Sequence, residues 1–163
     1  MAFIALGGNV GDVLRTFQAA REELAMVPGC RLAASSLLYA SPPLGPPDQP
    51  DYHNAMVGIV TELQPRTLLH EMQRIEDRHG RTRDVRWGPR TLDLDLIAMD
   101  GMMTNAAELT LPHPEMHTRV FVLQPLCDLA PEWQHPRMKQ TAHALLEACT
   151  RSGQARLENG TPW

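Results

Sequence analysis

The order of strand-like and helix-like hydrophobic patterns is the feature that most restricts the fold of this chain. Residues 3–9, FIALGGN, begin as an apolar strand and end in glycines. Asp12 is a residue type that caps helices, and the helical spacing after it extends to Pro28 and Gly29, with apolar positions at Val13, Phe17, Ala20 and Leu24. A strand followed by a helix is therefore predicted at the start of the chain.

Two more strands, a second helix and a fourth strand are predicted within the first hundred residues. Residues 31–40 and 54–63 have the composition of strands, and they can form an antiparallel pair joined by a long proline-rich loop. Pro65 opens an amphipathic helix that Gly80 ends. Residues 91–99, TLDLDLIAM, alternate as a strand does.

This βαββαβ order predicts an α+β fold, a ferredoxin-like sandwich with helices on one face of an antiparallel sheet. Residues 115–129 and 141–151 have helical patterns and are expected to add C-terminal helices to that core. A chain of 163 residues, 43% of them hydrophobic, has the size and composition of one domain. We therefore expect a single domain spanning residues 1–163.

Cysteine usage and hydropathy favour a soluble intracellular protein. Cys30, Cys127 and Cys149 are far apart and form no C-x-x-C pair, which is typical of buried thiols in a reduced compartment. The first residues lack the basic start and apolar core of a signal peptide, and no apolar run approaches the ~18 residues of a membrane span. A cytoplasmic location is the expectation.

The basic residues are unusual in type and in position. The chain has fourteen arginines, Lys139 as its single lysine, and a formal net charge of −4, which argues against general nucleic-acid binding. Six of the arginines fall between Arg74 and Arg90. Guanidinium groups match the oxygens of phosphates in pairs, so this cluster is consistent with an anion site. A solvated basic helix end and loop explains the charge alone equally well.

The segment LDLDL at residues 92–96 adds a second chemical feature. In a strand Asp93 and Asp95 point to one face, with Cα atoms about 6.5–7 Å apart, and the leucines point to the other. An isolated D-x-D is usually only the polar side of a half-buried strand. Here arginines precede it closely, and carboxylates, a divalent cation, phosphate oxygens and arginines neutralise one another. The combination favours a nucleotide site, although the chain has no G-x-x-x-x-G-K-[ST] loop.

Five segments, in order, are similar to one known family. They are ALGGN, SPPLGPPDQPDYHNA, QRIEDRHGR, RWGPRTLDLDL and LPHPEMHTRVFVLQPL. They resemble the 6-hydroxymethyl-7,8-dihydropterin pyrophosphokinases of folate biosynthesis over nearly the whole chain. The resemblance implies an ATP- and magnesium-dependent enzyme that transfers the diphosphate of ATP to the pterin hydroxymethyl group and releases AMP.

The same resemblance implies roles for individual residues. Two Mg²⁺ ions would be ligated by Asp93 and Asp95, and the catalytic group would be Arg81, Arg90, Asp93 and Asp95. ATP would be bound by Gln73, Glu76, Arg83, Arg86, Trp87, Leu96, Thr110, His113 and Arg119. The pterin would stack between Tyr52 and Phe121 and contact Asn54, with a wall formed by Pro43, Leu44 and Gly45.

Two positions depart from the family pattern, and two other functions remain open. Glu108 stands where some relatives carry a basic residue, and Gly8 replaces a common serine.

The expected partners are ATP and the pterin alone, with no nucleic acid and no membrane, and the protein is expected to be a monomer. An RNA-binding module has the same βαββαβ order but stacking aromatics instead of aspartates on its sheet. A carrier that binds pterin or nucleotide without catalysis is the other alternative.

Overall fold

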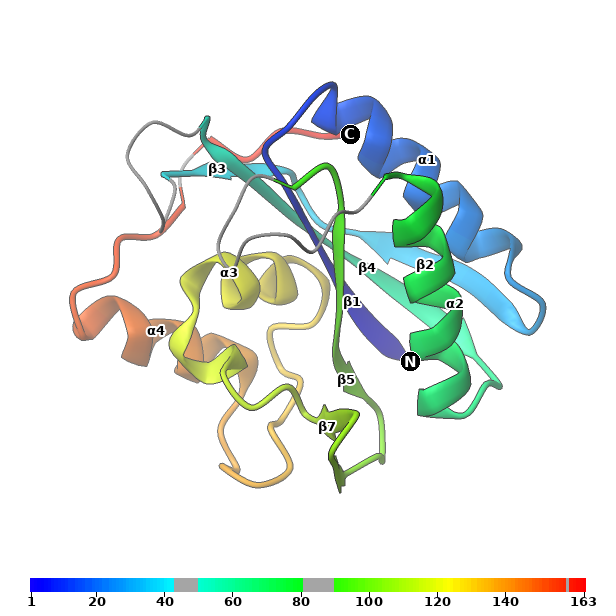
Figure 1. Ribbon diagram of the computed structural model, residues 1–163. Helices are drawn as coiled ribbons and strands as arrows, with labels where there is room; N and C mark the ends of the chain where they lie inside the picture. The colour runs from blue at the N-terminus through cyan, green and yellow to red at the C-terminus, as the bar shows by residue number, and fades with distance from the viewer. Residues whose placement is uncertain (43–49, 81–89, 158) are drawn as a thin grey trace.

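The computed structural model describes residues 1–42, 50–80, 90–157 and 159–163. Its centre is an antiparallel sheet in which four strands follow the order β2-β4-β1-β5 and a fifth, β3, also pairs with β4 (Figure 1). These strands are β1 (Ala2–Gly8), β2 (Cys30–Ser35), β3 (Tyr39–Ser41), β4 (Tyr52–Thr61) and β5 (Asp93–Met99). A separate hairpin consists of β6 (Thr104–Ala106) and β7 (Leu109–Leu111).

Helices cover both faces of the sheet (Figure 1). The chain forms four α-helices and a short 3₁₀-helix in its described part: α1 (Val13–Met26), α2 (Pro65–Arg78), η1 (Met116–Thr118), α3 (Val120–Leu129) and α4 (Ala142–Arg151). One buried cluster joins α1 and α2 to one sheet face, and a second joins α3 and α4 to the other. The expected α+β class with an antiparallel sheet is confirmed, and the C-terminal helices form a third layer.

The helix ends agree with the signals in the sequence. The Asp12 carboxylate accepts the backbone N–H of Arg15 at 3.1 Å, which caps α1. Pro65 occupies the first turn of α2, where the lack of a backbone N–H costs no helical hydrogen bond. Gly80 follows α2 with φ at +73°, a conformation that glycine adopts without strain.

The expectation of helices on one face only was incomplete, and the second face explains why. Phe3, Met56 and Ile97 point to that face and are almost fully buried. Three large apolar side chains on an open sheet would remain in water, at a cost of about 1.5–3 kcal/mol each. The apolar sides of α3 and α4 remove them from solvent.

Two predicted elements are divided in the structure. Residues 31–40 are not one strand, because β2 ends at Ser35 and β3 begins at Tyr39. Between them Leu38 exchanges backbone hydrogen bonds with Thr161, at 2.8 and 3.0 Å, so the C-terminal segment interrupts the pairing. The predicted helix 115–129 is likewise divided, since Arg119 between η1 and α3 has an extended backbone.

All three cysteines are free thiols; Cys149 is buried, as expected for an apolar filler, whereas Cys30 and Cys127 are only half-buried. None of the helices in the described residues is long and apolar enough to cross a membrane.

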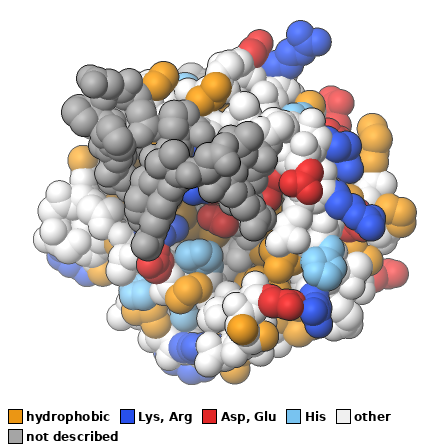
Figure 2. All heavy atoms as spheres, viewed as in Figure 1, with side chains coloured by type: hydrophobic (Ala, Val, Ile, Leu, Met, Phe, Trp, Pro, Cys, Tyr) orange, Lys and Arg blue, Asp and Glu red, His pale blue; other side chains and the backbone are white. Residues whose placement is uncertain are grey.

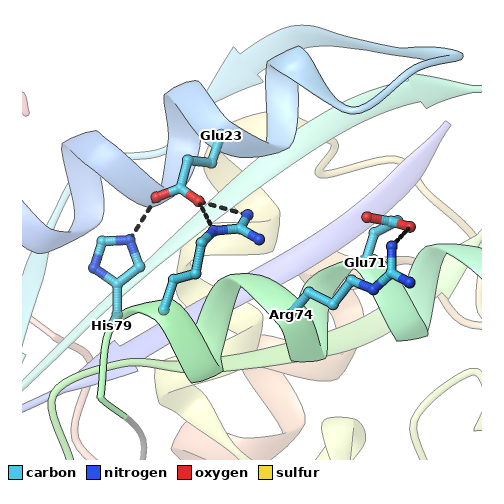
Figure 3. Close-up of polar contacts among 5 residues, drawn as sticks. Glu23, Glu71, Arg74 and His79 are labelled. Carbon is cyan, nitrogen blue, oxygen red and sulfur yellow. Dashed lines mark hydrogen bonds and ion pairs between the residues drawn. The ribbon is translucent and has the colours of Figure 1, made fainter.

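An ion-pair cluster fastens α1 to the C-terminal end of α2 (Figure 3). The carboxylate of Glu23 on α1 accepts hydrogen bonds from Arg78, at 2.7 Å, and contacts His79 Nε2 at 2.8 Å. Burial alone would raise the pKa of Glu23, but the hydrogen bonds and charges of Arg78 and His79 bring that pKa below its ordinary value. The ionised form of Glu23 therefore stabilises the fold.

We expect Glu23→Gln to lower the free energy of unfolding at pH 7 by about 1 kcal/mol. A carboxylate whose pKa is lowered on folding contributes stability above its ordinary pKa of 4.5, and this stability is lost as pH falls through the folded pKa. The difference between variant and unchanged chain should therefore vanish in acid. Urea unfolding at several pH values measures it.

Glu71 provides the matched control (Figure 3). Its side chain is 29% exposed, as is that of Glu23, but it pairs with Arg74 at 3.0 Å within α2 and forms no ion pair with another element among the described residues. Glu71→Gln should cost no more than about 0.5 kcal/mol. Equal losses in the two variants would contradict a specific role for Glu23 in joining the helices.

Candidate active site

The predicted polar residues of β4 and β5 meet on one sheet face beside the C-terminal end of β1. Gly7 is directly opposite Asn54 on one side and Asp93 on the other, and Ala5 is opposite Asp95. Residues directly opposite in a sheet project to the same face. Asn54, Asp93 and Asp95 therefore share the face that α3 and α4 cover further along the sheet.

The leucines between the aspartates point the other way, as the alternation predicts. Leu92, Leu94 and Leu96 are buried in the cluster with α1 and α2. The packing of these leucines fixes the direction of both carboxylates, because a strand that buries one set of side chains must present the other set.

An arginine, a carboxylate and a tyrosine form the centre of the site. Arg90 Nη1 donates to Asp93 Oδ2 at 2.6 Å. Burial raises the pKa of Tyr52, while the charge of Arg90 opposes this shift and that of Asp93 adds to it. The Asn54 amide donates to Ser41 Oγ at 2.9 Å. The charged residues of β5 and the polar end of β4 therefore form one connected group.

The segment before and inside α3 supplies a third group. Burial lowers the pKa of His113; the negative charges of Asp95 and Asp93 oppose this and the positive charge of Arg119 adds to it. Arg119 forms an ion pair with Glu115, and its guanidinium lies 5.7 Å from the centre of the Phe121 ring. Figure 2 shows acidic, basic and histidine side chains gathered on this face of the molecule.

Four more of the residues predicted to contact ATP lie on α2, β5 and β7. Glu76 on α2 is 1% exposed, and its Oε1 accepts the backbone N–H of Leu94 at 2.7 Å. Gln73 lies three residues earlier on α2, half-buried. Thr110 is opposite Asn105 in the β6–β7 hairpin. Because the Leu96 side chain is buried in the core, any contact that Leu96 makes with a ligand involves its backbone.

Seven predicted site residues lie outside the described residues. They are Pro43, Leu44 and Gly45 on the pterin side, and Arg81, Arg83, Arg86 and Trp87 on the phosphate side.

The donors on β5 suit magnesium bound together with a phosphorylated ligand. Asp93 and Asp95 offer hard carboxylate oxygens on one face, the ligand type that Mg²⁺ prefers. Among the described residues no group of three or more His, Cys, Asp or Glu side chains could hold a metal ion. Mg²⁺ usually retains water and takes one or two carboxylates plus substrate phosphates, so two aspartates are a sufficient protein contribution.

Sequence reasoning missed Asn9 and Ser41. Asn9 directly follows β1 and is 4% exposed. Its side chain forms hydrogen bonds with the backbone of Arg90 and of Pro50. Ser41 orients the Asn54 amide. For Asn9 the only indication in the sequence was an asparagine after two glycines at a strand end, and for Ser41 there was none. Both Asn9 and Ser41 contact residues that are distant along the chain.

The two departures from the family pattern have structural counterparts. A Cβ atom on Gly8 would lie 2.7 Å from the backbone oxygen of Thr91, so this backbone approach requires glycine. Glu108 forms an exposed ion pair with Arg66 at 2.9 Å, next to β7.

Sequence comparisons identify similar proteins over most of the chain. Residues 3–131 match the family model described as 7,8-dihydro-6-hydroxymethylpterin-pyrophosphokinase. A 2-amino-4-hydroxy-6-hydroxymethyldihydropteridine pyrophosphokinase from Synechocystis is 47% identical over 90% of this chain and 74% of that protein. Its namesake from Pseudomonas aeruginosa is 43% identical over 95% of both chains.

Structural comparisons agree on the fold. A crystal structure of HPPK-DHPS in complex with substrates superposes with a TM-score of 0.69 over 93% of this chain, at 13% identity. A wild-type Plasmodium falciparum HPPK-DHPS with SDX-DHP gives 0.65 over 90%, at 15% identity. The chain spans 43% of each of these two longer proteins.

Proposed function

Because the chain belongs to the 7,8-dihydro-6-hydroxymethylpterin-pyrophosphokinase family, we propose that it transfers diphosphate from ATP to the hydroxymethyl group of 6-hydroxymethyl-7,8-dihydropterin. AMP is the second product, and the reaction belongs to folate biosynthesis. One structural observation supports this most strongly: Asp93, which bonds to Arg90, and Asp95 share the sheet face that also bears Asn54.

In this proposal the carboxylates bind the triphosphate through Mg²⁺, and the arginines bind it directly. Asp93 and Asp95 would hold Mg²⁺, which would supply charge neutralisation to the phosphates. Arg90 is held beside Asp93 at 2.6 Å, where its remaining N–H donors can reach a phosphate oxygen. His113 lies near the same carboxylates, and the charge of Arg119 also acts on it. The positive groups face the oxygens on which charge develops in the transition state.

The pterin occupies the β4 side of the site in this proposal. Tyr52 and Phe121 are both half-buried aromatic residues, and a flat bicycle stacks on such rings. The Asn54 amide, oriented by Ser41, reads the hydrogen-bonding edge of the ring system. This arrangement directs the hydroxymethyl oxygen toward the β-phosphorus near Asp93 and Asp95.

Several finer proposals accompany this function. The strand order β2-β4-β1-β5 supports a ferredoxin-like core extended by α3 and α4. We also propose that the enzyme works as a monomer in the cytoplasm.

Product analysis tests the function directly. The chain is supplied with Mg²⁺, ATP and 6-hydroxymethyl-7,8-dihydropterin, and the nucleotides are separated by ion-exchange chromatography. AMP should form only when the pterin is present. ADP as the product would refute a pyrophosphokinase, and tight binding of both ligands with no AMP would favour a non-catalytic carrier.

Phe121→Ala should raise the KM for the pterin by roughly 5- to 150-fold, because a lost stacking contact costs about 1–3 kcal/mol. The KM for ATP should change less, since the variant retains Asp93, Asp95 and Arg90 and on the ATP side loses only the ring beside Arg119. Initial rates over a range of each substrate measure both constants.

Leu129→Ala is the matched control for this variant. Leu129 lies on the same helix and packs against the same apolar cluster, but near Gly58 instead of the site. Equal increases of the pterin KM in the two variants would show that Phe121 contributes only to packing.

A further inference from the structure

Asn9 joins two parts of the site that are distant in the sequence. Its backbone N–H donates to the Arg90 carbonyl at 2.9 Å, and its side-chain Oδ1 accepts the Arg90 N–H, also at 2.9 Å. Its Nδ2 donates to the Pro50 carbonyl at 3.3 Å. One residue, 4% exposed, therefore holds the backbone at Pro50 and at Arg90.

Both anchored positions lead directly to proposed ligand-binding residues. Arg90 makes the 2.6 Å contact with Asp93, so fixing its backbone limits where its guanidinium and that carboxylate can lie. Pro50 stands two residues before Tyr52, at the start of β4. The Asn9 contacts thus connect the phosphate side of the site to the pterin side.

The chemistry of the side chain explains why asparagine suits this position. The Arg90 contact requires an acceptor and the Pro50 contact requires a donor, and the short amide provides one of each. The neighbouring Gly8 allows the close approach, because a Cβ there would lie 2.7 Å from the Thr91 oxygen. A buried side-chain amide with two such bonds is costly to remove, and its removal loosens two backbone segments together.

We propose that Asn9 is a positioning residue, which sets the relative placement of Arg90 and Tyr52 and thereby aligns the two substrates. This inference rests on the proposed pyrophosphokinase function. Asn9 acts through Arg90 and Pro50 and is assigned no contact with either substrate. Misplacement of reacting groups by about 1 Å can cost roughly 100-fold in rate.

Kinetics of three variants test this role. Asn9→Ala should lower kcat by roughly 30- to 100-fold and raise the KM for the pterin. If Asn9 acts on kcat through Arg90, the double variant Asn9→Ala/Arg90→Ala should have the kcat of Arg90→Ala alone. Multiplying losses in the double variant would overturn the proposed route through Arg90.

Ser36→Ala is the control for loss of a buried polar group. Ser36 is also 4% exposed, and its hydroxyl accepts the Met56 N–H at 2.8 Å and donates to the Leu37 carbonyl at 2.7 Å. Ser36→Ala should lower the unfolding midpoint in urea much as Asn9→Ala does, with kcat and both KM values unchanged. Equal kinetic losses in the two variants would show that Asn9 contributes only to stability, which would overturn the positioning role.

Amide hydrogen exchange separates this inference from the proposed function. The Arg90 amide should exchange at least about ten times faster in Asn9→Ala than in the unchanged chain, and Ser36→Ala should leave it protected. This readout needs no catalysis. Absence of AMP from the unchanged chain would refute the function alone, whereas an unaltered Arg90 amide or unaltered turnover in Asn9→Ala would refute the positioning role.

Discussion

Asp95→Asn is expected to lower kcat about 1,000-fold, because losing this proposed metal ligand would remove several kcal/mol of transition-state stabilisation. The fold should survive, since the Asp95 side chain projects from the sheet face opposite the buried Leu94 and Leu96. Replacing Asp93 instead would also release Arg90 from its 2.6 Å contact with that carboxylate.

Asp100→Asn provides the comparison for this variant. Asp100 directly follows β5, is exposed, and pairs with the N-terminal amine at 3.4 Å, away from the site. Its replacement removes a carboxylate from the same segment and should leave kcat unchanged. Rates and unfolding midpoints are measured for both variants. Full turnover by Asp95→Asn would contradict the metal assignment.

Removing magnesium should have the second large effect. Excess EDTA is expected to reduce AMP formation by at least about 1,000-fold, and added Mg²⁺ should restore it. The physical reason is charge: Asp93 and Asp95 project from one face, and ATP brings further negative charge to it. Arg90, which pairs with Asp93, offsets only part of that charge, and a divalent ion would offset more of it.

A magnesium titration extends this test. Asp95→Asn should need a higher Mg²⁺ concentration than the unchanged chain for half of its own maximal rate. In the absence of ATP, EDTA should leave the unfolding midpoint unchanged, because the ion binds with the nucleotide in this account. Undiminished AMP formation in EDTA would rule out the ion's proposed role.

The elements that were predicted correctly from the sequence are determined by residues close together along the chain. Asp12 caps α1 through a residue three positions away, and Pro65 and Gly80 delimit α2 by their own backbone restrictions. The direction of Asp93 and Asp95 also follows from local alternation, since the leucines between them are buried.

The features that sequence reasoning missed depend on distant contacts. Thr161 interrupts the predicted strand 31–40 by pairing with Leu38, and no pattern within that strand indicates it. Asn9 contacts residues 41 and 81 positions away. The C-terminal helices were predicted, but the sheet face that they cover was not, because the apolar residues on that face, such as Phe3 and Met56, come from separate strands. The pterin, for its part, could be named only through the family resemblance.

The central claim is tested most directly by identifying which phosphate bond of ATP is broken. Phosphorus NMR of the reaction with ATP, Mg²⁺ and 6-hydroxymethyl-7,8-dihydropterin identifies both products in one spectrum. The account predicts AMP and a pterin ester with two coupled phosphorus signals, formed in equal amounts and absent without the pterin. A pterin ester with a single uncoupled phosphorus signal, accompanied by ADP, would contradict it.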